Sequence, residues 1–215
     1  MRLKLAVVHW LPVEMYPPAI NLIRYFAASA LWDVSLHTTE NRHGRPAFCH
    51  DDVRIFRSAD PGSRGVWGRT WAYVIFYLGT VLRLITSRPD VVLYIEPQSS
   101  FPVFLYSFLR RRLSLFIHHH EYHDPEQFFR PGMRLPRLFH RFEQMRLFRR
   151  ADWISHTNPE RLRFFLRDHP GIDPATGRVL PNLPPASWFG PPNSAWAETL
   201  RLPLRMVSVG SLSRR

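Results

Sequence analysis

Short apolar runs alternate along the chain with longer stretches of helical periodicity. Continuous apolar runs at 3–9 and 91–95 are typical of strands that are buried on both faces. Shorter runs predict further strands at 33–37, 53–57, 113–117, 153–155 and 178–180. Apolar positions with helical spacing predict helices at 18–27, 67–87, 99–112, 136–150 and 159–167. This alternation predicts an α/β fold, a Rossmann-like parallel sheet of about six or seven strands with helices on both faces.

The segment from Trp67 to Ser87 is the most apolar of the expected helices. Its longest apolar run, Trp71 to Leu82, is shorter than the ~20 residues that a membrane-spanning helix needs. Arg83 closes the run. We therefore expect a mostly buried helix of a soluble domain rather than a membrane span.

The pattern changes after residue 180. Residues 181–203 contain six prolines, without a clear period, and are typical of a linker. A new apolar strand follows and ends at Gly210, which is how a second nucleotide-binding domain would begin. We therefore expect a Rossmann-like domain at 1–180, a linker at 181–203 and the first strand of a second domain at 204–215. One strand cannot form a domain, so the chain is expected to be a fragment.

The charge is strongly positive, with a net value of +12 that comes almost entirely from arginine. This balance favours anionic partners such as sugar nucleotides, lipid phosphates or nucleic acid. The single cysteine, Cys49, excludes a disulfide framework and fits a reducing compartment. The apolar run near Met1 is short, and no small-residue cleavage site follows it, so we expect no secretory signal and a cytoplasmic protein.

Four histidines and three carboxylates lie together at 118–126, directly after an expected strand. Imidazole and carboxylate groups suit Zn or Mn, so a metal site is one interpretation. However, neighbouring residues of an extended segment point to opposite faces, so at most His118 and His120 converge. We therefore expect no metal, and leave two interpretations: His120 takes part in catalysis or sugar binding, or the histidines are structural.

Other polar side chains follow the expected strands, where open α/β sheets bind their ligands. Glu121 could orient His120 or accept from a sugar hydroxyl, and Glu96 ends the strand at 91–95. Glu14 and Tyr16 lie in the loop after the first strand and could bind acceptor hydroxyls. The alternative for each of these is a packing or surface role.

Several segments carry a family resemblance when they are taken in order. They are "RPDVVLYIEP", "LSLFIHHHEYHDPEQF", "ADWISHTNPERLRFF", "VLPNLPPASW" and "LRMVSVGSLS". Together they resemble the N-terminal half of a GT-B glycosyltransferase of the family 4 type, over about residues 1–200. Such enzymes face two Rossmann-like domains across a cleft, with the acceptor held mainly by the first domain and the nucleotide-sugar donor by the second. The resemblance implies sugar transfer to a glycan or lipid-linked acceptor, with the nucleotide sugar as co-substrate and no cofactor or metal.

The resemblance also implies roles for single residues. His120-Glu121 matches the catalytic His-Asp pair after the fifth strand, with His119 beside it on the acceptor side. Asn158 falls in the acceptor-side loop where the family often has Ser-Glu. On the donor side, Asn182 matches the Asn of a "PNG" turn, while Gly210 and Ser211 take the places of Gly and Arg in "VGRL".

The stretch 130–150 is rich in arginine, with Glu143 as the one opposing charge. A core-facing helix with a solvated basic face is one interpretation, and docking on an anionic membrane surface is another. Basic charge with interleaved aromatics also fits nucleic acid, but the α/β motif order does not, so none is expected. A non-catalytic subunit of a split glycosyltransferase is a further alternative.

Overall fold

The computed structural model describes residues 2–41, 44, 46–59, 65–110 and 112–182. Within them, parallel strands form one seven-stranded sheet in the order β3-β2-β1-β4-β5-β6-β7. The strands are β1 (Leu3–His9), β2 (Trp32–Thr39), β3 (Val53–Ser58), β4 (Val91–Ile95), β5 (Ser114–His119), β6 (Trp153–His156) and β7 (Gly177–Val179). The order reverses between β1 and β4, which is where sheets of this kind bind ligands.

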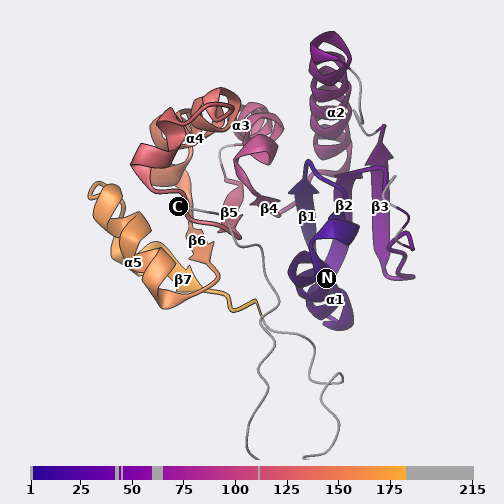
Figure 1. Cartoon of the computed structure of the whole chain (residues 1–215). Helices are drawn as coiled ribbons and strands as arrows, with labels where there is room; N and C mark the ends of the chain where they lie inside the picture. Colours follow the sequence, from indigo (N-terminus) through magenta and orange to yellow (C-terminus); the bar gives the residue numbers. More distant parts are fainter. Residues whose placement is uncertain (1, 42–43, 45, 60–64, 111, 183–215) are drawn as a thin grey trace, which may run out of the picture. The chain divides into compact units, whose positions relative to one another are not determined.

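Helices cover both faces of the sheet, which confirms the expected Rossmann-like α/β class (Figure 1). The helices are α1 (Pro17–Ala28), α2 (Val66–Ser87), α3 (Ser100–Leu109), α4 (Arg134–Arg146) and α5 (Pro159–Asp168). In the described residues, five short 3-10 helices lie in the connections: η1 (Val13–Met15), η2 (Pro97–Ser99), η3 (Pro125–Phe129), η4 (Phe148–Arg150) and η5 (Pro174–Thr176). In Figure 1, α1 lies on one side of the sheet, and α2, α3 and α4 lie on the other.

The two cores follow from the alternation of side chains along each strand. Leu5 and Val7 pack on the α1 side, whereas Ala6 and Val8 pack on the side of α2 to α5. All five residues of β4 are buried, which explains why this strand appears in the sequence as a continuous apolar run. Burying one such side chain contributes roughly 1.5–3 kcal/mol, so β4 is a major source of stability.

Three sequence expectations need correction. The helix at 67–87 exists as α2, but it is not mostly buried: only 22% of its most apolar window is covered. Both of its sides are apolar, and only one can pack on the sheet. The strand expected at 113–117 runs on to His119, so two of the four histidines belong to β5 rather than to a loop. The helix expected at 99–112 is shorter, because α3 ends at Leu109.

The described residues through Asn182 belong to one compact unit. The expected linker at 181–203 lies outside the described residues except for Pro181 and Asn182. The expected strand of a second domain, with Gly210 and Ser211, lies wholly outside them. The domain boundaries therefore stay predictions.

Candidate functional site

The candidate site lies at the carboxyl ends of β1, β4, β5 and β6. Parallel strands bring these ends to one edge of the sheet. Tyr16 comes from the loop after β1, Glu96 follows β4 directly, and His120 follows β5. A 2.9 Å hydrogen bond from the Trp10 N–H to Ser99 Oγ joins the first two loops across the reversal point. The fold therefore brings together residues that are about a hundred positions apart in the chain.

The histidines of β5 divide between the two faces of the sheet. The rings of His118 and His120 lie 4.7 Å apart on the α1 side, with Nδ1 of His118 2.8 Å from Ser155 Oγ. His119 points the opposite way, toward α4. This is the geometry that the alternation along an extended segment predicts. In the part of the chain that the structure describes, no group of three or more His, Cys, Asp or Glu side chains is placed to hold a metal ion.

His120 is held on several sides. Its ring stacks on Tyr16 with centroids 5.3 Å apart, and its N–H donates to Glu96 Oε1 at 2.7 Å. Its carbonyl oxygen accepts from Thr157 Oγ1 at 3.2 Å and from the Arg161 guanidinium. Burial, with positive charge at His119 and Arg161, lowers the pKa of His120 to about 4. The Nε2 of this neutral imidazole is buried and has no hydrogen-bond partner among the described residues, so its bonding capacity is unused in this structure.

Glu96 occupies a strained position at the end of β4. Its φ is +66°, which costs a non-glycine residue roughly 1–2 kcal/mol. Pro97 follows Glu96 and begins η2, and the Glu96 N–H donates to His118 O at 3.1 Å. Burial raises the pKa of Glu96 to about 7. A carboxyl that ionises near neutrality can accept a proton from a hydroxyl, so this strained residue is a candidate proton acceptor.

The side of β5 that faces α4 holds an ion pair. His119 Nε2 lies 3.3 Å from Glu143 Oε1, and Glu143 is fully buried. Burial alone would lower the pKa of His119, but the Glu143 carboxylate raises it above its ordinary value. In the sequence Glu143 stands out only as a lone acid in a basic helix, and its partner could not be identified there.

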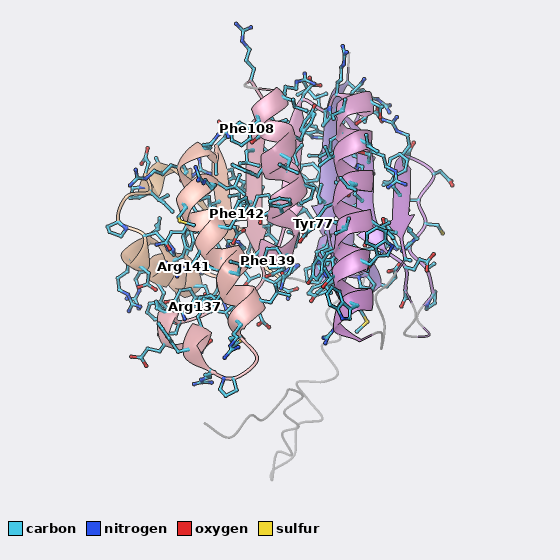
Figure 2. The ribbon with its side chains drawn as sticks, turned by 90° about the horizontal axis from the view of Figure 1, so that it is seen from above. Tyr77, Phe108, Arg137, Phe139, Arg141 and Phe142 are labelled. Atoms are coloured by element: carbon cyan, nitrogen blue, oxygen red, sulfur yellow. The ribbon has the colours of Figure 1, made fainter. Side chains whose placement is uncertain are left out.

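A cavity of about 340 Å³ opens beside this pair. Its polar wall includes Glu96, His119 and Glu121, from the ends of β4 and β5. Its other walls carry aromatic rings and two arginines of α4: Tyr122, Phe128, Phe129, His140, Phe165, Arg137 and Arg141. In Figure 2, Arg137 and Arg141 lie on the side of α4 that faces away from α3. Clefts with apolar walls and a few polar groups are typical of small-molecule sites.

The remaining sequence candidates lie in different settings. Glu14 is 4% exposed, and its Oε1 accepts from the Phe48 N–H at 2.7 Å and from Arg57 at 2.6 Å. This carboxylate is therefore engaged within the protein. Asn158 is exposed, and its Oδ1 caps α5 by accepting from the Arg161 N–H at 2.8 Å. Asn182 is exposed next to the end of the described residues.

Tyr16 contacts two histidines, His120 and His9. Besides stacking on His120, it meets the ring of His9 edge-on at 4.6 Å. Burial, with the charges of Glu96 and Glu121, raises its pKa to about 12. The phenol therefore stays protonated at neutral pH and can donate a hydrogen bond.

Sequence reasoning missed several residues of the site. Tyr122 donates to Asp168 of α5 and lines the cavity. Histidines 140, 156 and 169 also line the cavity, although each stands alone in the sequence. Each lies in or directly after an element that also packs apolar residues on the side of α2 to α5, such as Ile154 and Phe165. This position in the sequence does not distinguish a histidine that lines a cavity from one that is packed in a core.

Residues 20–183 match the family described as "Glycosyl transferase 4-like domain". This match spans most of the chain. The chain belongs to the glycosyl transferase 4-like family. The resemblance noted from the sequence motifs is thereby confirmed, and so is the half-GT-B fold class. A search of curated proteins finds no match.

Solved structures share the fold of this glycosyl transferase 4-like chain at low identity. Sucrose-phosphate synthase from Thermosynechococcus elongatus aligns with a TM-score of 0.54 and 14% identity, over 87% of this chain and 91% of that chain. The apo form of the lipopolysaccharide outer core galactosyltransferase WaaB aligns with a TM-score of 0.52 and 11% identity, over 82% of this chain and 45% of that chain. UDP-N-acetylglucosamine 2-epimerase from Rickettsia bellii aligns with a TM-score of 0.53 and 12% identity, over 82% of this chain and 44% of that chain. The chain thus spans less than half the length of the last two.

Proposed function

We propose that this glycosyl transferase 4-like chain is the acceptor-side domain of an enzyme that moves a sugar from a nucleotide sugar to an acceptor hydroxyl. The observation that carries the proposal is the cavity at the carboxyl ends of β4 and β5, with Glu96, His119 and Glu121 in its wall. Family membership and the fold support the same reaction class. One fold neighbour is a UDP-GlcNAc 2-epimerase bound to UDP-GlcNAc, which supports a nucleotide-sugar partner.

The cavity suits an acceptor with a ring and a negative charge. Aromatic side chains such as Phe128 and Phe165 provide faces on which a sugar ring can pack. Arg137 and Arg141 provide donors for a phosphate. We infer a glycan or lipid-linked acceptor whose phosphate lies near these arginines.

Two sets of residues share the chemistry in this proposal. Glu96 and Glu121, which both lie in the wall of the cavity, hold the acceptor hydroxyl. Glu96 is the group that can take the proton of this hydroxyl near neutral pH. His120 lies on the other side of β5, stacked on Tyr16, and its buried, unpartnered Nε2 would bond the transferred sugar once the surrounding side chains move to uncover it. The donor would be held largely by groups outside the described residues.

The experiment is a transfer assay on the full-length gene product with a panel of nucleotide sugars. Release of nucleoside diphosphate that depends on an added acceptor is the expected result. Glu121→Gln should raise the KM for the acceptor, whereas Glu160→Gln on α5, whose side chain is 68% exposed and does not line the cavity, should not. Interconversion of UDP-GlcNAc and its 2-epimer without any transfer would overturn the proposal.

A further inference from the structure

Helix α2 exposes a continuous apolar stripe to solvent. Its outward side chains recur at intervals of three and four residues, which places them on one side of the helix. They are Trp67, Trp71, Ile75, Leu78, Leu82 and Ile85, and each is between 40% and 87% exposed. The opposite side of α2, with Phe76 and Leu84, is packed in the core. A helix that is apolar on both sides is ordinarily buried, so the exposed stripe requires an explanation.

The neighbouring helices extend this surface. Exposed apolar side chains continue on α3 (Phe101, Leu105, Phe108 and Leu109) and on α4 (Leu135, Leu138 and Met145). Aromatic contacts join the three helices: Tyr77 lies 5.5 Å from Phe101, and Phe101 lies 5.6 Å from Phe142. Figure 2 shows α2, α3 and α4 in one layer, with Tyr77 and Phe142 between them. We call the outer surface of α2, α3 and α4 the helical face.

The helical face is also positively charged. Helices α2 and α3 contain no acidic residue, and the one acid of α4, Glu143, is fully buried against His119. Exposed arginines of the same helices accompany the apolar side chains at positions 69, 134 and 146. The described part of this face therefore joins apolar side chains to arginines without exposing a carboxylate.

We propose that the helical face docks on an anionic lipid bilayer, with the α2 stripe inserted among the acyl chains and the α4 arginines at the headgroups. Interfacial helices bury an apolar side to about 5–10 Å, and tryptophans favour the headgroup level. Arginines close to an anionic leaflet strengthen such binding. A second copy of the chain fits less well, because the described part of this face exposes no carboxylate that could pair with the arginines of the other copy.

The same geometry shows how α2 lies on the bilayer. The helix is long and apolar enough to cross a membrane by length and composition. However, Phe76 is 1% exposed and Leu84 is fully buried in the core formed with the sheet. A membrane-spanning orientation would remove Phe76 and Leu84 from the core, so in this proposal α2 lies along the surface of the bilayer. This proposal does not depend on the catalytic one.

The test measures co-flotation of the purified chain with vesicles of phosphatidylcholine, with or without phosphatidylglycerol. We expect binding to the anionic vesicles that weakens as salt is raised, because the Debye length falls from about 10 Å at 0.1 M to about 3 Å at 1 M. The double variant Leu78→Ser/Leu82→Ser should weaken partitioning on the order of a hundredfold, since burial of each leucine contributes roughly tenfold or more. The double variant Arg134→Glu/Arg146→Glu should remove the preference for anionic lipid.

Matched controls lie on other surfaces. Leu31→Ser alters a leucine that is 67% exposed, against 63% for Leu82, and Arg24→Glu alters an arginine of α1 on the opposite side of the sheet. Both controls should bind vesicles like the unaltered chain. Circular dichroism checks that each variant is folded, which is expected because the altered side chains are exposed.

Three results would overturn the proposal. The first is no vesicle binding at low salt. The second is equal weakening by the controls. The third is a concentration-dependent dimer, or binding of RNA, that the Leu78→Ser/Leu82→Ser variant abolishes while vesicle binding is unchanged.

Discussion

The His120 N–H donates a 2.7 Å hydrogen bond to the Glu96 carboxylate and so ties the end of β5 to the end of β4. The same carboxylate sits in the wall of the cavity, at a residue with φ of +66°. One side chain thus positions the segment that carries His120 and faces the proposed acceptor. Mutations of Glu96 should therefore separate its positioning role from its chemical role.

Glu96→Gln keeps an oxygen that can accept from the His120 N–H but removes the ionisable group. Because burial raises the pKa of Glu96 to about 7, the carboxylate forms as pH rises through about 7, and transfer by the wild type should rise with it. The variant should lose this rise and lower kcat on the order of a hundredfold. The measurement is kcat against pH for the full-length enzyme, with Glu160→Gln as control. An unaltered pH profile in Glu96→Gln would remove Glu96 as the proton acceptor.

The buried His119–Glu143 pair should couple strongly. Removing one partner leaves the other buried without compensation, so Glu143→Ala should cost about 3–5 kcal/mol of unfolding free energy. Urea unfolding of both single variants and the double variant measures the coupling energy, which we expect to be about 1–3 kcal/mol. If the losses of unfolding free energy in the two single variants simply add up in the double variant, His119 and Glu143 do not stabilise each other.

The pair also predicts a pH dependence with a definite sign. The pKa of His119 is raised above its ordinary value, so its contribution to stability is complete below pH 6.5 and is lost as pH rises through the raised pKa. The difference in unfolding free energy between the wild type and His119→Gln should therefore shrink at alkaline pH. A difference that grows with pH would show that His119 is neutral in the folded protein.

His120→Phe tests the role of the ring nitrogens. Phenylalanine can keep the stacking on Tyr16, whose ring centroid lies 5.3 Å from that of His120, but it cannot bond a sugar hydroxyl. We expect transfer to fall on the order of a hundredfold while the melting temperature stays close to that of the wild type. Unchanged turnover would leave His120 with a purely structural role.

Glu14 is expected to act in stability rather than in acceptor binding. Its Oε1 accepts from Phe48 N–H and Arg57, and Arg57 is one cause that holds its pKa below the ordinary value although burial opposes this. Glu14→Ala should cost about 1–3 kcal/mol of unfolding free energy, because a buried N–H and a guanidinium lose their acceptor. The KM for the acceptor should stay unchanged. A raised KM with normal stability would instead support the acceptor-binding role that its position in the sequence indicates.

The sheet could be predicted from the sequence because its strands carry their own signal. β4 is buried on both faces and therefore apolar at every position, and β1 is nearly so. The pairing of His119 with Glu143 could not be predicted, since it depends on how α4 packs on β5, 24 positions away. The exposure of α2 was hidden for a similar reason, because its inner and outer sides are both apolar.

The site was predictable only as far as strand ends could be located. Glu96 and Glu121 follow expected strands, and the structure places both in the cavity wall. Glu14 follows a strand in the same way, but its carboxylate binds Arg57 of β3. A sequence shows which residues reach the ligand edge, whereas the partner that each one meets there depends on packing.

Buried neutral histidines should make the domain sensitive to mild acid. Burial lowers the pKa of His9 and of His37 to about 3, and both side chains are almost inaccessible to water. Because these folded-state values lie below the unfolded value of 6.5, the stability is complete above pH 6.5. This stability is then lost at roughly 1.4 kcal/mol per pH unit for each histidine as pH falls toward 3.

Urea unfolding at pH 7, 6 and 5 should show this loss, and His37→Gln should reduce the dependence of unfolding free energy on pH by about the contribution of one histidine. His123→Gln, in the half-exposed loop after β5, serves as the comparison. Equal slopes for the wild type and His37→Gln would mean that His37 is protonated in the fold, contrary to its apolar setting beside Phe56.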